Sequence, residues 1–203
     1  MDLILNGEAR PFDASDCANL AEVVARAESL EAEGLPCVVT AVEIDGEPLP
    51  PEALCFLEIR PIADVKRISI VRRPRREVAQ SVLAQGADYC ERIAQAIGQT
   101  VADYRSNRTQ QASRVLADVL DSISVLTGIT YSISAELSDA ATRLAELQGE
   151  IHPWLEAMLE AQSGDDPIRI ADLLEYEIAP RIEDWGRAMR SFAPGSAPLA
   201  AGR

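Results

Sequence analysis

A single imidazole limits the catalytic chemistry that this sequence can support. His152 is the only histidine among 203 residues, so a Ser-His-Asp or Cys-His mechanism would have to use it. It stands in the run Glu150-Ile151-His152-Pro153-Trp154, which we interpret as the start of a short helix, where a histidine more often has a surface or capping role. The sequence also lacks a glycine-rich phosphate loop, a G-x-S-x-G elbow and an H-E-x-x-H motif. We therefore expect no enzyme activity and assign no catalytic residue.

Carboxylates occur at two places with spacings that suit acid–base catalysis or metal binding. Asp118 and Asp121 are three residues apart and so share one face of a helix, and Asp172, Glu175 and Glu177 form a second group. Helical bundles that bind two metal ions through carboxylates need a Glu-x-x-His pair on each of two helices, which one histidine cannot supply. We expect these acids to face solvent, and we predict neither a cofactor nor a metal ion.

A basic stretch between positions 66 and 76 is the strongest local feature of the sequence. It contains six of the chain's 19 Lys and Arg residues and no acid: Lys66, Arg67, Arg72, Arg73, Arg75 and Arg76. Such a concentration in an acidic chain has two interpretations. It is either a docking patch for an acidic protein, a nucleic-acid backbone or an anionic headgroup, or a connector whose arginines pair with the chain's own acids or guard a strand edge.

The overall composition disfavours several classes of partner and location. Asp and Glu number 33 against 19 Lys and Arg, which gives a net charge of -14, and like charge opposes binding to nucleic acid or an anionic membrane. Aromatic residues make up only 4%, a poor supply for stacking on bases. We recognise no secretory signal and no apolar run near the roughly 18–20 residues of a membrane helix. We expect a cytoplasmic protein without membrane insertion.

The cysteines are spread along the chain without a C-x-x-C pair: Cys17, Cys37, Cys55 and Cys90. A structural zinc site needs more closely spaced ligand pairs. We therefore expect four reduced thiols, as in a cytoplasmic protein.

Residues 1–73 alternate with period two on either side of one helical segment. Asn6-Gly7 and Asp45-Gly46 tolerate positive φ and predict tight turns. Strands are predicted at 2–8, 9–12, 37–44 and 65–71. Ser15 or Asp16 is expected to cap the helix, and Gly34 to end it. The buried face of this helix is predicted to comprise Leu20, Val23, Val24, Ala27 and Leu30.

From Pro74 to about Phe192 the period becomes helical, which predicts antiparallel helices packed along three apolar stripes. The first stripe contains Val82, Tyr89, Ile93, Ile97, Val101 and Tyr104. The second contains Val115, Val119, Ile123, Leu126, Ile133, Leu137, Leu144 and Leu147. The third contains Ile170, Leu174, Ile178, Ile182, Trp185, Met189 and Phe192. Asp166-Pro167 predicts the start of the last helix, and Pro180 a bend within it.

The segment from Ser122 to Ser134 conflicts with the helical pattern, because it combines β-branched residues with Gly128. An unbroken helix over 108–148 would be roughly 60 Å long at about 1.5 Å per residue, longer than its neighbours could cover. A break is therefore an alternative. We favour a helix that continues through the segment and is bent or loosened near Gly128.

The order strand, strand, helix, strand, strand in residues 1–73 resembles the ubiquitin-like β-grasp. The loop at 47–61, with Pro48, Pro50, Pro51 and Pro61, leaves room for one short turn and not for a second helix. The resemblance implies a module that presents a sheet face or edge to another protein. Val71 runs into Arg72-Arg73-Pro74 and not into a Gly-Gly tail, so a conjugated modifier is excluded. The segments 155–162 and 170–185 resemble the C-terminal pattern of uncharacterised bacterial helical proteins, which we associate with motility-type accessory factors.

These patterns predict an α+β chain: a small β-grasp-like ββαββ module at 1–73, an antiparallel helical bundle at 74–193 and a disordered tail at 194–203. We predict a non-enzymatic interaction or adaptor protein of the bacterial cytosol. Its partner is expected to be another protein, with an acidic surface as one option and homo-oligomers as another. The alternative is a helical bundle that binds a small ligand or metal in its core. That alternative requires buried polar groups facing a cavity, whereas an adaptor requires filled seams and an exposed patch.

Overall fold

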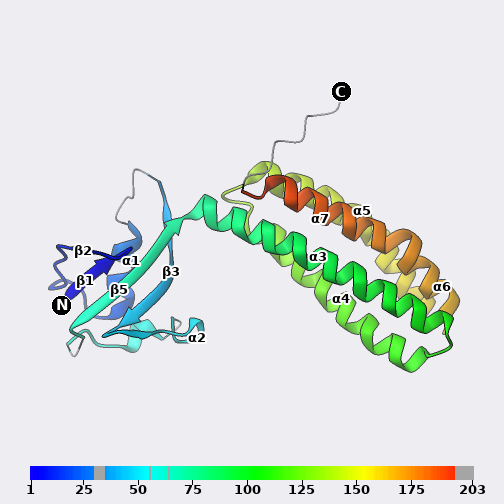
Figure 1. Cartoon of the computed structure of the whole chain (residues 1–203), viewed down its shortest axis with the longest axis horizontal. Coiled ribbons are helices and arrows are strands. Elements are labelled where there is room, and N and C mark those ends of the chain that lie inside the picture. Colours follow the sequence, from blue (N-terminus) through cyan, green and yellow to red (C-terminus); the bar gives the residue numbers. More distant parts are fainter. Residues whose placement is uncertain (30–34, 55, 64, 195–203) are drawn as a thin grey trace. The chain divides into compact units, whose positions relative to one another are not determined.

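The chain folds into two compact units, Met1–Val78 and Ala79–Arg203 (Figure 1). The structure is a computed structural model that describes residues 1–29, 35–54, 56–63 and 65–194. The first unit is built on a five-stranded sheet and the second on helices, so the predicted α+β class is confirmed. The division falls a few residues later than the predicted boundary after residue 73, because the first turn of the long helix that begins at Arg75 belongs with the sheet. The predicted disordered tail lies outside the described residues from 195 onward.

The sheet of the first unit has the strand order β2-β1-β5-β3-β4. Its strands are β1 (Asp2–Leu5), β2 (Glu8–Arg10), β3 (Cys37–Ile44), β4 (Glu47–Pro48) and β5 (Arg67–Pro74). The two central strands, β1 and β5, are parallel, and the other neighbouring pairs are antiparallel. A register shift interrupts the β3–β5 ladder between Val39 and Ala41.

Both predicted tight turns are present, and their backbone explains the residues found there. Asn6 and Gly7 have φ values of 51° and 83°, and Asp45 and Gly46 have φ values of 52° and 90°. Two successive residues with positive φ form the tight hairpin turn that suits the right-handed twist of the strands. Asp45 also accepts hydrogen bonds through Oδ1 from the backbone N–H groups of residues 66 and 67, at 3.1 and 2.8 Å.

Helix α1 (Leu20–Ser29) packs on one face of this sheet. Its cap differs from the prediction: the side chain of Asn19, and not that of Ser15 or Asp16, accepts a hydrogen bond from the Glu22 N–H at 3.0 Å, because the helix starts later than expected. Leu30 and Gly34 lie outside the described residues. The buried core of the unit comprises Leu3, Leu5, Leu20, Val23, Ala27, Val42, Leu57, Ile68 and Ile70.

The proline-rich loop contains more local structure than the single short turn predicted for it. After β4 the chain forms α2 (Pro51–Leu54) and the 3₁₀ turn η1 (Leu57–Ile59). Leu57 is buried against the core of the unit. The loop therefore contributes to the packing of the sheet unit as well as joining two strands.

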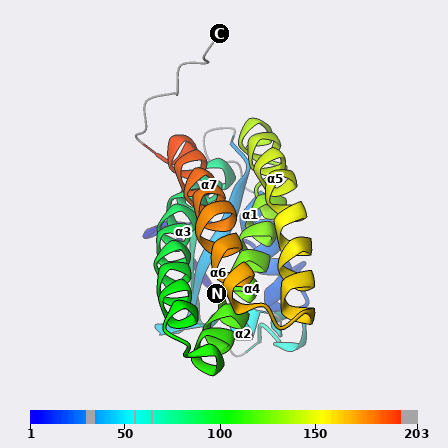
Figure 2. The same ribbon diagram turned by 90° about the vertical axis from the view of Figure 1, so that its right-hand side faces the viewer.

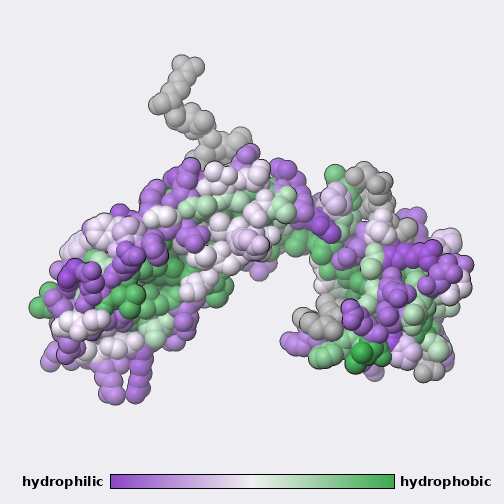
Figure 3. All heavy atoms as spheres, turned by 180° about the vertical axis from the view of Figure 1, so that it is seen from behind, coloured by the Kyte–Doolittle hydropathy of each residue, from purple (hydrophilic) through white to green (hydrophobic). Residues whose placement is uncertain are grey.

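The second unit consists of long helices that run alongside one another (Figures 1 and 2). They are α3 (Arg75–Arg105), α4 (Thr109–Ser132), α5 (Ser138–Ser163), α6 (Pro167–Asp172), the π-helical segment η2 (Leu173–Ile178) and α7 (Ala179–Phe192). One face of this unit carries hydrophobic residues bordered by hydrophilic ones (Figure 3).

The three predicted apolar stripes form the core of the bundle. Trp185 is 0% exposed, and the rest of the third stripe is buried except Phe192, which is half-buried. The first stripe needs a correction at its start: Val82 and Tyr89 are half-buried, whereas Leu83, Ala87 and Cys90 are buried. In the second stripe only Val115 is half-buried.

The prediction of a helix continuing through 108–148 is wrong. Helix α4 ends at Ser132 and α5 begins at Ser138. Gly128 lies inside α4 on its exposed side, where a missing side chain reduces helix propensity without removing any packing contact. The chain reverses at 133–137, where Ile133 and Leu137 are buried in the bundle core. Because the chain reverses here, α4 and α5 can pack against each other. A single helix over 108–148 would instead extend beyond its neighbours and leave apolar side chains exposed.

The last helix starts where the sequence predicts, and its hydrogen-bonding pattern changes just before Pro180. Asp166 caps α6 by accepting a hydrogen bond from the Arg169 N–H at 3.0 Å, and Pro167 occupies the first turn. Pro180 has no N–H to donate to the carbonyl four residues earlier. The widened π-helical turns of η2 end immediately before this part of the chain, which is where a missing backbone hydrogen bond is easiest to accommodate.

Candidate functional site

The histidine and the first pair of acids singled out in the sequence lie on the surface of different helices. The side chain of His152 is 72% exposed, and its Nε2 lies 3.5 Å from Glu156 Oε1 on the same helix. It lies within α5 and not at a helix start. The first pair of acids, Asp118 and Asp121, is exposed on α4.

The second group of acids pairs with arginines. Arg105 forms ion pairs with Glu175 and, at 3.5 Å, with Asp172, and Arg181 pairs with Glu177 at 3.0 Å. Among the described residues, no group of three or more His, Cys, Asp or Glu side chains could hold a metal ion. Asp172 and Glu175 thus take part in a contact between α3 and the last helices, and Glu177 in a pair with the residue four positions later.

The described cysteines are free thiols: Cys17, Cys37 and Cys90. Cys55 lies outside the described residues. Burial raises the pKa of the Cys90 thiol to about 12, so this thiol stays protonated near neutral pH. A protonated and buried thiol is a poor nucleophile.

Side chains of β5 point alternately to the two faces of the sheet, so the basic residues on this strand lie on different faces. Ile68, Ile70 and Arg72 point to the face of the sheet that α1 covers. The Arg72 side chain is buried, and its Nη1 donates a 3.0 Å hydrogen bond to the carbonyl of Ala27 in the last turn of α1. This residue is therefore not available to a docking partner, because its guanidinium binds the C-terminal end of a helix, where cations are favoured.

The remaining five basic residues are exposed. Arg73 lies 3.8 Å from Glu77 in an exposed ion pair, and Arg75 donates through Nε to the carbonyl of Cys37 at 3.3 Å. Within the described parts of the chain, no ion pair involves Lys66, Arg67 or Arg76. Five of the six basic residues predicted to form a patch therefore lie on the surface, and Arg72 does not.

The sheet face opposite α1 brings apolar side chains together with two of these arginines. We call it the outer sheet face; it comprises Asp2, Ile4, Ala9, Val38, Ala41, Glu43, Arg67, Ser69, Val71 and Arg73. Val71 lies at the centre of this face and is 42% exposed. Arg73 is two residues further along the same strand, so its side chain lies on the same face. At one end of the face a hollow of about 270 Å³ is lined by Ile4, Ala9 and Arg67, among others. The sequence did not indicate this face, because the pairing of strands distant in the chain creates it.

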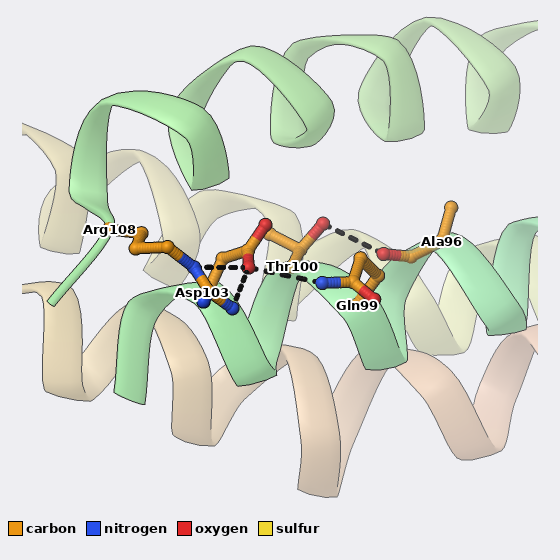
Figure 4. A network of polar contacts seen from close by, with 5 residues as sticks. All are labelled: Ala96, Gln99, Thr100, Asp103 and Arg108. Atoms are coloured by element: carbon orange, nitrogen blue, oxygen red, sulfur yellow. Dashed lines mark hydrogen bonds and ion pairs between the residues drawn. The ribbon is translucent and has the colours of Figure 1, made fainter. Parts of the chain in front are cut away.

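The bundle also contains a buried carboxylate that the sequence pattern does not predict. Asp103 on α3 is fully buried, and its Oδ1 accepts hydrogen bonds from Gln99 Nε2 at 3.1 Å and from Arg108 Nε and Nη2 at 2.9 and 2.6 Å (Figure 4). The Arg108 backbone N–H donates to the Asp103 carbonyl at 2.9 Å. These contacts close the turn between α3 and α4, and the only sequence signal for them is an acid placed beside Tyr104 in an apolar stripe.

The bundle also has a surface groove between α3 and α7. Its volume is about 350 Å³, and it is lined by Cys90, Glu91, Gly186 and Arg190, among others. Gly186 allows the close approach here, since a side-chain Cβ at this position would lie 2.9 Å from the Cβ of Cys90. Arg190 pairs with Glu91 at 2.7 Å across the groove, so its charged groups already have partners.

Among the residues that the structure describes, one helix is long and apolar enough to cross a membrane by length and composition: α4, Thr109–Ser132, with a mean hydropathy of 1.2 over its most apolar window. This differs from the prediction that no segment approaches that length. Its inward side chains, such as Leu116, Val119 and Leu126, are buried in the bundle. The helices that form the core of a protein pass the same test.

Comparison with known proteins identifies one family. The family described as Domain of unknown function (DUF8042) matches residues 81–188, which extend from α3 into α7. The N-terminal sheet lies outside the matched segment. No curated protein and no solved structure matches the chain.

Proposed function

Because the chain belongs to the DUF8042 family, whose description gives no activity, we propose its function from the site. The protein is a non-enzymatic adaptor of the bacterial cytosol that binds an acidic partner protein through its outer sheet face. The exposed Val71, placed between Arg67 and Arg73 on a face that α1 does not cover, is the observation that supports this most.

The composition of the face indicates the chemistry of the partner. Apolar side chains at its centre supply area that can be removed from water, at roughly 25 cal/mol per Å². Arginines at its two ends favour carboxylates, because the planar guanidinium binds them in two-point geometry. A partner segment with acidic residues flanking an apolar centre would match both features. An acidic partner also suits the basic stretch at 66–76, which contains no acid, although Asp2 and Glu43 on the neighbouring strands lie on the same face.

For the N-terminal unit itself we propose a ubiquitin-like β-grasp module. The order β2-β1-β5-β3-β4 with a parallel central pair, and the one helix packed on a single face, support this assignment. In this chain β5 is followed directly by α3, so the module is covalently continuous with the helices that come after it. In this proposal the outer sheet face binds the partner protein, as expected for an adaptor.

The test compares two double charge reversals in the full-length protein. Arg67→Glu with Arg73→Glu alters the outer sheet face, and Arg114→Glu with Arg143→Glu changes the charge equally on exposed positions of the bundle. Each pair includes one arginine in an exposed ion pair, with Glu77 or Glu146. Proteins captured from the native host and identified by mass spectrometry should be retained by the wild type and the bundle variant and lost by the sheet variant. The same proteins captured by all three would refute the proposed surface.

The alternative of a ligand-binding bundle has one observation in its favour. Asp103 Oδ2 is buried and has no hydrogen-bond partner among the described residues. Arg108 already pairs with the other oxygen of this carboxylate at 2.6 Å, which supplies the compensating charge that a bound cation would otherwise bring. A rise in melting temperature on addition of a divalent cation, absent from Asp103→Asn, would favour this alternative over the adaptor.

A further inference from the structure

Strand β3 has a neighbouring strand along only part of its outer edge. Strand β4 pairs with it at Glu43 and Ile44, and the Leu49 N–H donates to the Val42 carbonyl at 2.8 Å. Among the described residues, no strand lies on that side of residues 37–41. We call the stretch 37–41 the open edge of β3.

The backbone groups of Cys37 and Val39 point outward along the open edge. In an antiparallel ladder, the N–H and C=O of one residue point to the same side, and successive residues alternate between the partner strand and the opposite side. The Arg75 N–H donates to the Pro36 carbonyl at 2.9 Å, which identifies Cys37 and Pro74 as a pair without mutual hydrogen bonds. Cys37 and Val39 therefore direct their backbone groups away from β5.

The composition of this part of β3 favours pairing with a further strand. The run Cys37-Val38-Val39-Thr40-Ala41-Val42 contains no charged residue and no proline, and β-branched residues predominate in it. Edges of this composition pair readily with strands of other molecules, and proteins usually block them with charged side chains, proline or a covering element. The register shift lies between Val39 and Ala41, so the pairing of β3 with β5 is regular from Cys37 to Val39.

The shape of the surface also leaves room beside the open edge. A hollow of about 450 Å³ is lined by Ala25, Glu28, Pro36, Cys37 and Arg75, among others. The side chains of an added strand could enter this space. Something other than shape must therefore keep strands of other molecules away.

Two charged side chains occupy the hydrogen-bonding positions of the missing strand. The Glu28 carboxylate accepts through Oε1 from the Val39 N–H at 3.1 Å, and Arg75 donates through Nε to the Cys37 carbonyl at 3.3 Å. A neighbouring strand would place a carbonyl at the first position and an N–H at the second. Glu28 lies in the last turn of α1, and Arg75 is the first residue of α3.

We infer that Glu28 and Arg75 form an edge guard, a pair of side-chain contacts that prevents a strand of another molecule from adding to the open edge of β3. The polarity of the pair matches the edge, because the anion takes the N–H and the cation takes the carbonyl. Hydrogen bonds to ionised groups are stronger than those between neutral groups. An incoming strand would have to exchange two charge-assisted bonds for two neutral ones, which makes the exchange unfavourable. The guard acts at the sheet edge and does not depend on binding at the outer sheet face.

Amide hydrogen exchange of the full-length protein at low concentration tests the contact itself. Glu28→Ala should speed exchange of the Val39 amide about tenfold or more, because it removes the acceptor of that N–H. Glu28→Gln keeps an acceptor oxygen and should preserve most of the protection. Glu52→Ala is the matched control, since Glu52 is an exposed acid of the same unit, and it should leave the rate unchanged. Equal rates for Glu28→Ala and the control would overturn the inference.

Self-association of a double variant tests the guard function. Glu28→Ala with Arg75→Ala removes one charge of each sign, so the net charge of -14 and the repulsion between copies stay the same. In sedimentation experiments at a salt concentration that screens this repulsion, the double variant should associate with a dissociation constant about tenfold or more below that of the wild type. Glu52→Ala with Arg60→Ala changes the same charges on exposed positions of the sheet unit and should behave as the wild type. Equal association of the two double variants would contradict the guard.

A third substitution distinguishes pairing at the open edge from aggregation of an unfolded chain. Proline has no N–H, and its ring would occupy the outward position at residue 39. The Val39 N–H bonds to Glu28 and not to β5, so Val39→Pro removes no hydrogen bond between β3 and β5. Added to the double variant without Glu28 and Arg75, Val39→Pro should restore the association of the wild type. Association that persists or increases with proline at this position would overturn the inference, because it would not depend on the open edge.

Discussion

Among the described residues, each of the two units buries one charged side chain, and the partner of that side chain differs between the units. In the sheet unit Arg72 donates a hydrogen bond to the carbonyl of Ala27 at the end of α1, 45 positions away in sequence. In the bundle Asp103 pairs with Arg108, five positions away, across a single turn. The buried cation thus depends on the assembled tertiary structure, while the buried anion obtains its partner locally. The comparison suggests that Arg72 reports on folding of the whole sheet unit and Asp103 on one hairpin of the bundle.

The largest expected effect tests the filled core of the bundle. Trp185→Ala should reduce the free energy of unfolding by about 3–5 kcal/mol, because it removes a fully buried side chain and leaves a cavity. Chemical denaturation followed by circular dichroism measures the loss. Trp185→Phe should cost less, since it keeps an aromatic ring and removes an indole N–H that has no partner among the described residues. An unchanged midpoint for the alanine variant would place Trp185 on a surface.

The next effect concerns the buried anion. Arg108→Ala should destabilise the bundle by about 3 kcal/mol, because it leaves the buried Asp103 carboxylate without its counter-charge. Adding Asp103→Asn to that variant should recover part of the loss, since a neutral amide is easier to bury than an unpaired carboxylate. A double-mutant cycle from denaturant midpoints measures the coupling. Additive effects would show that the pair does not act as a unit.

The buried cation gives a matched comparison between adjacent arginines. Arg72→Ala should cost about 2 kcal/mol through the lost hydrogen bond and the lost packing of its stem. Arg73→Ala should cost less than about 1 kcal/mol, because its ion pair with Glu77 is exposed. Amide chemical shifts of residues near α1 would identify which unit is affected. Equal losses would mean that the alternation of β5 does not decide the role of these arginines.

The last expected effect is a dependence of bundle stability on alkaline pH. The pKa of Cys90 is raised from 9.0 to about 12 by burial, so the folded protein retains a proton that the unfolded chain releases at lower pH. The corresponding stability is fully present below pH 9 and is lost as the pH rises from about 9 to 12. Denaturation midpoints measured for the wild type and for Cys90→Ala should diverge only in that interval. Parallel curves would contradict the assigned cause.

Local signals determined a large part of the fold. The turns at Asn6-Gly7 and Asp45-Gly46, the strand from Cys37 to Ile44 and the cap at Asp166 agree with the structure. Each of these depends on the φ preference, the alternation or the capping group of a few adjacent residues. The stripe from Ile170 to Met189 was equally clear, because a helix repeats its buried face at a fixed spacing whatever it packs against.

The burial of Arg72 and Asp103 could not be predicted from local signals. Arg72 is two residues after Ile70, so it points to the same buried face of β5 as Ile68 and Ile70. The predicted strand ends at Val71 and therefore does not include Arg72. The length of β5 was decided by its pairing with β3, whose Val39 lies opposite Arg72. Asp103 could be recognised as buried only once the helices around the end of α3 were in position.

The sequence by itself therefore determined the tight turns at Asn6-Gly7 and Asp45-Gly46, the residues that repeat on one helix face and the capped start of α6, since neighbours in the chain set these properties. The tertiary structure alone decided the strand order with β1 parallel to β5, the end of α4 at Ser132, and which apolar and basic side chains remain on a surface. The physical reason is that exposure depends on what packs opposite a residue. In this chain those partners come from segments tens of residues away, such as Ala27 for Arg72.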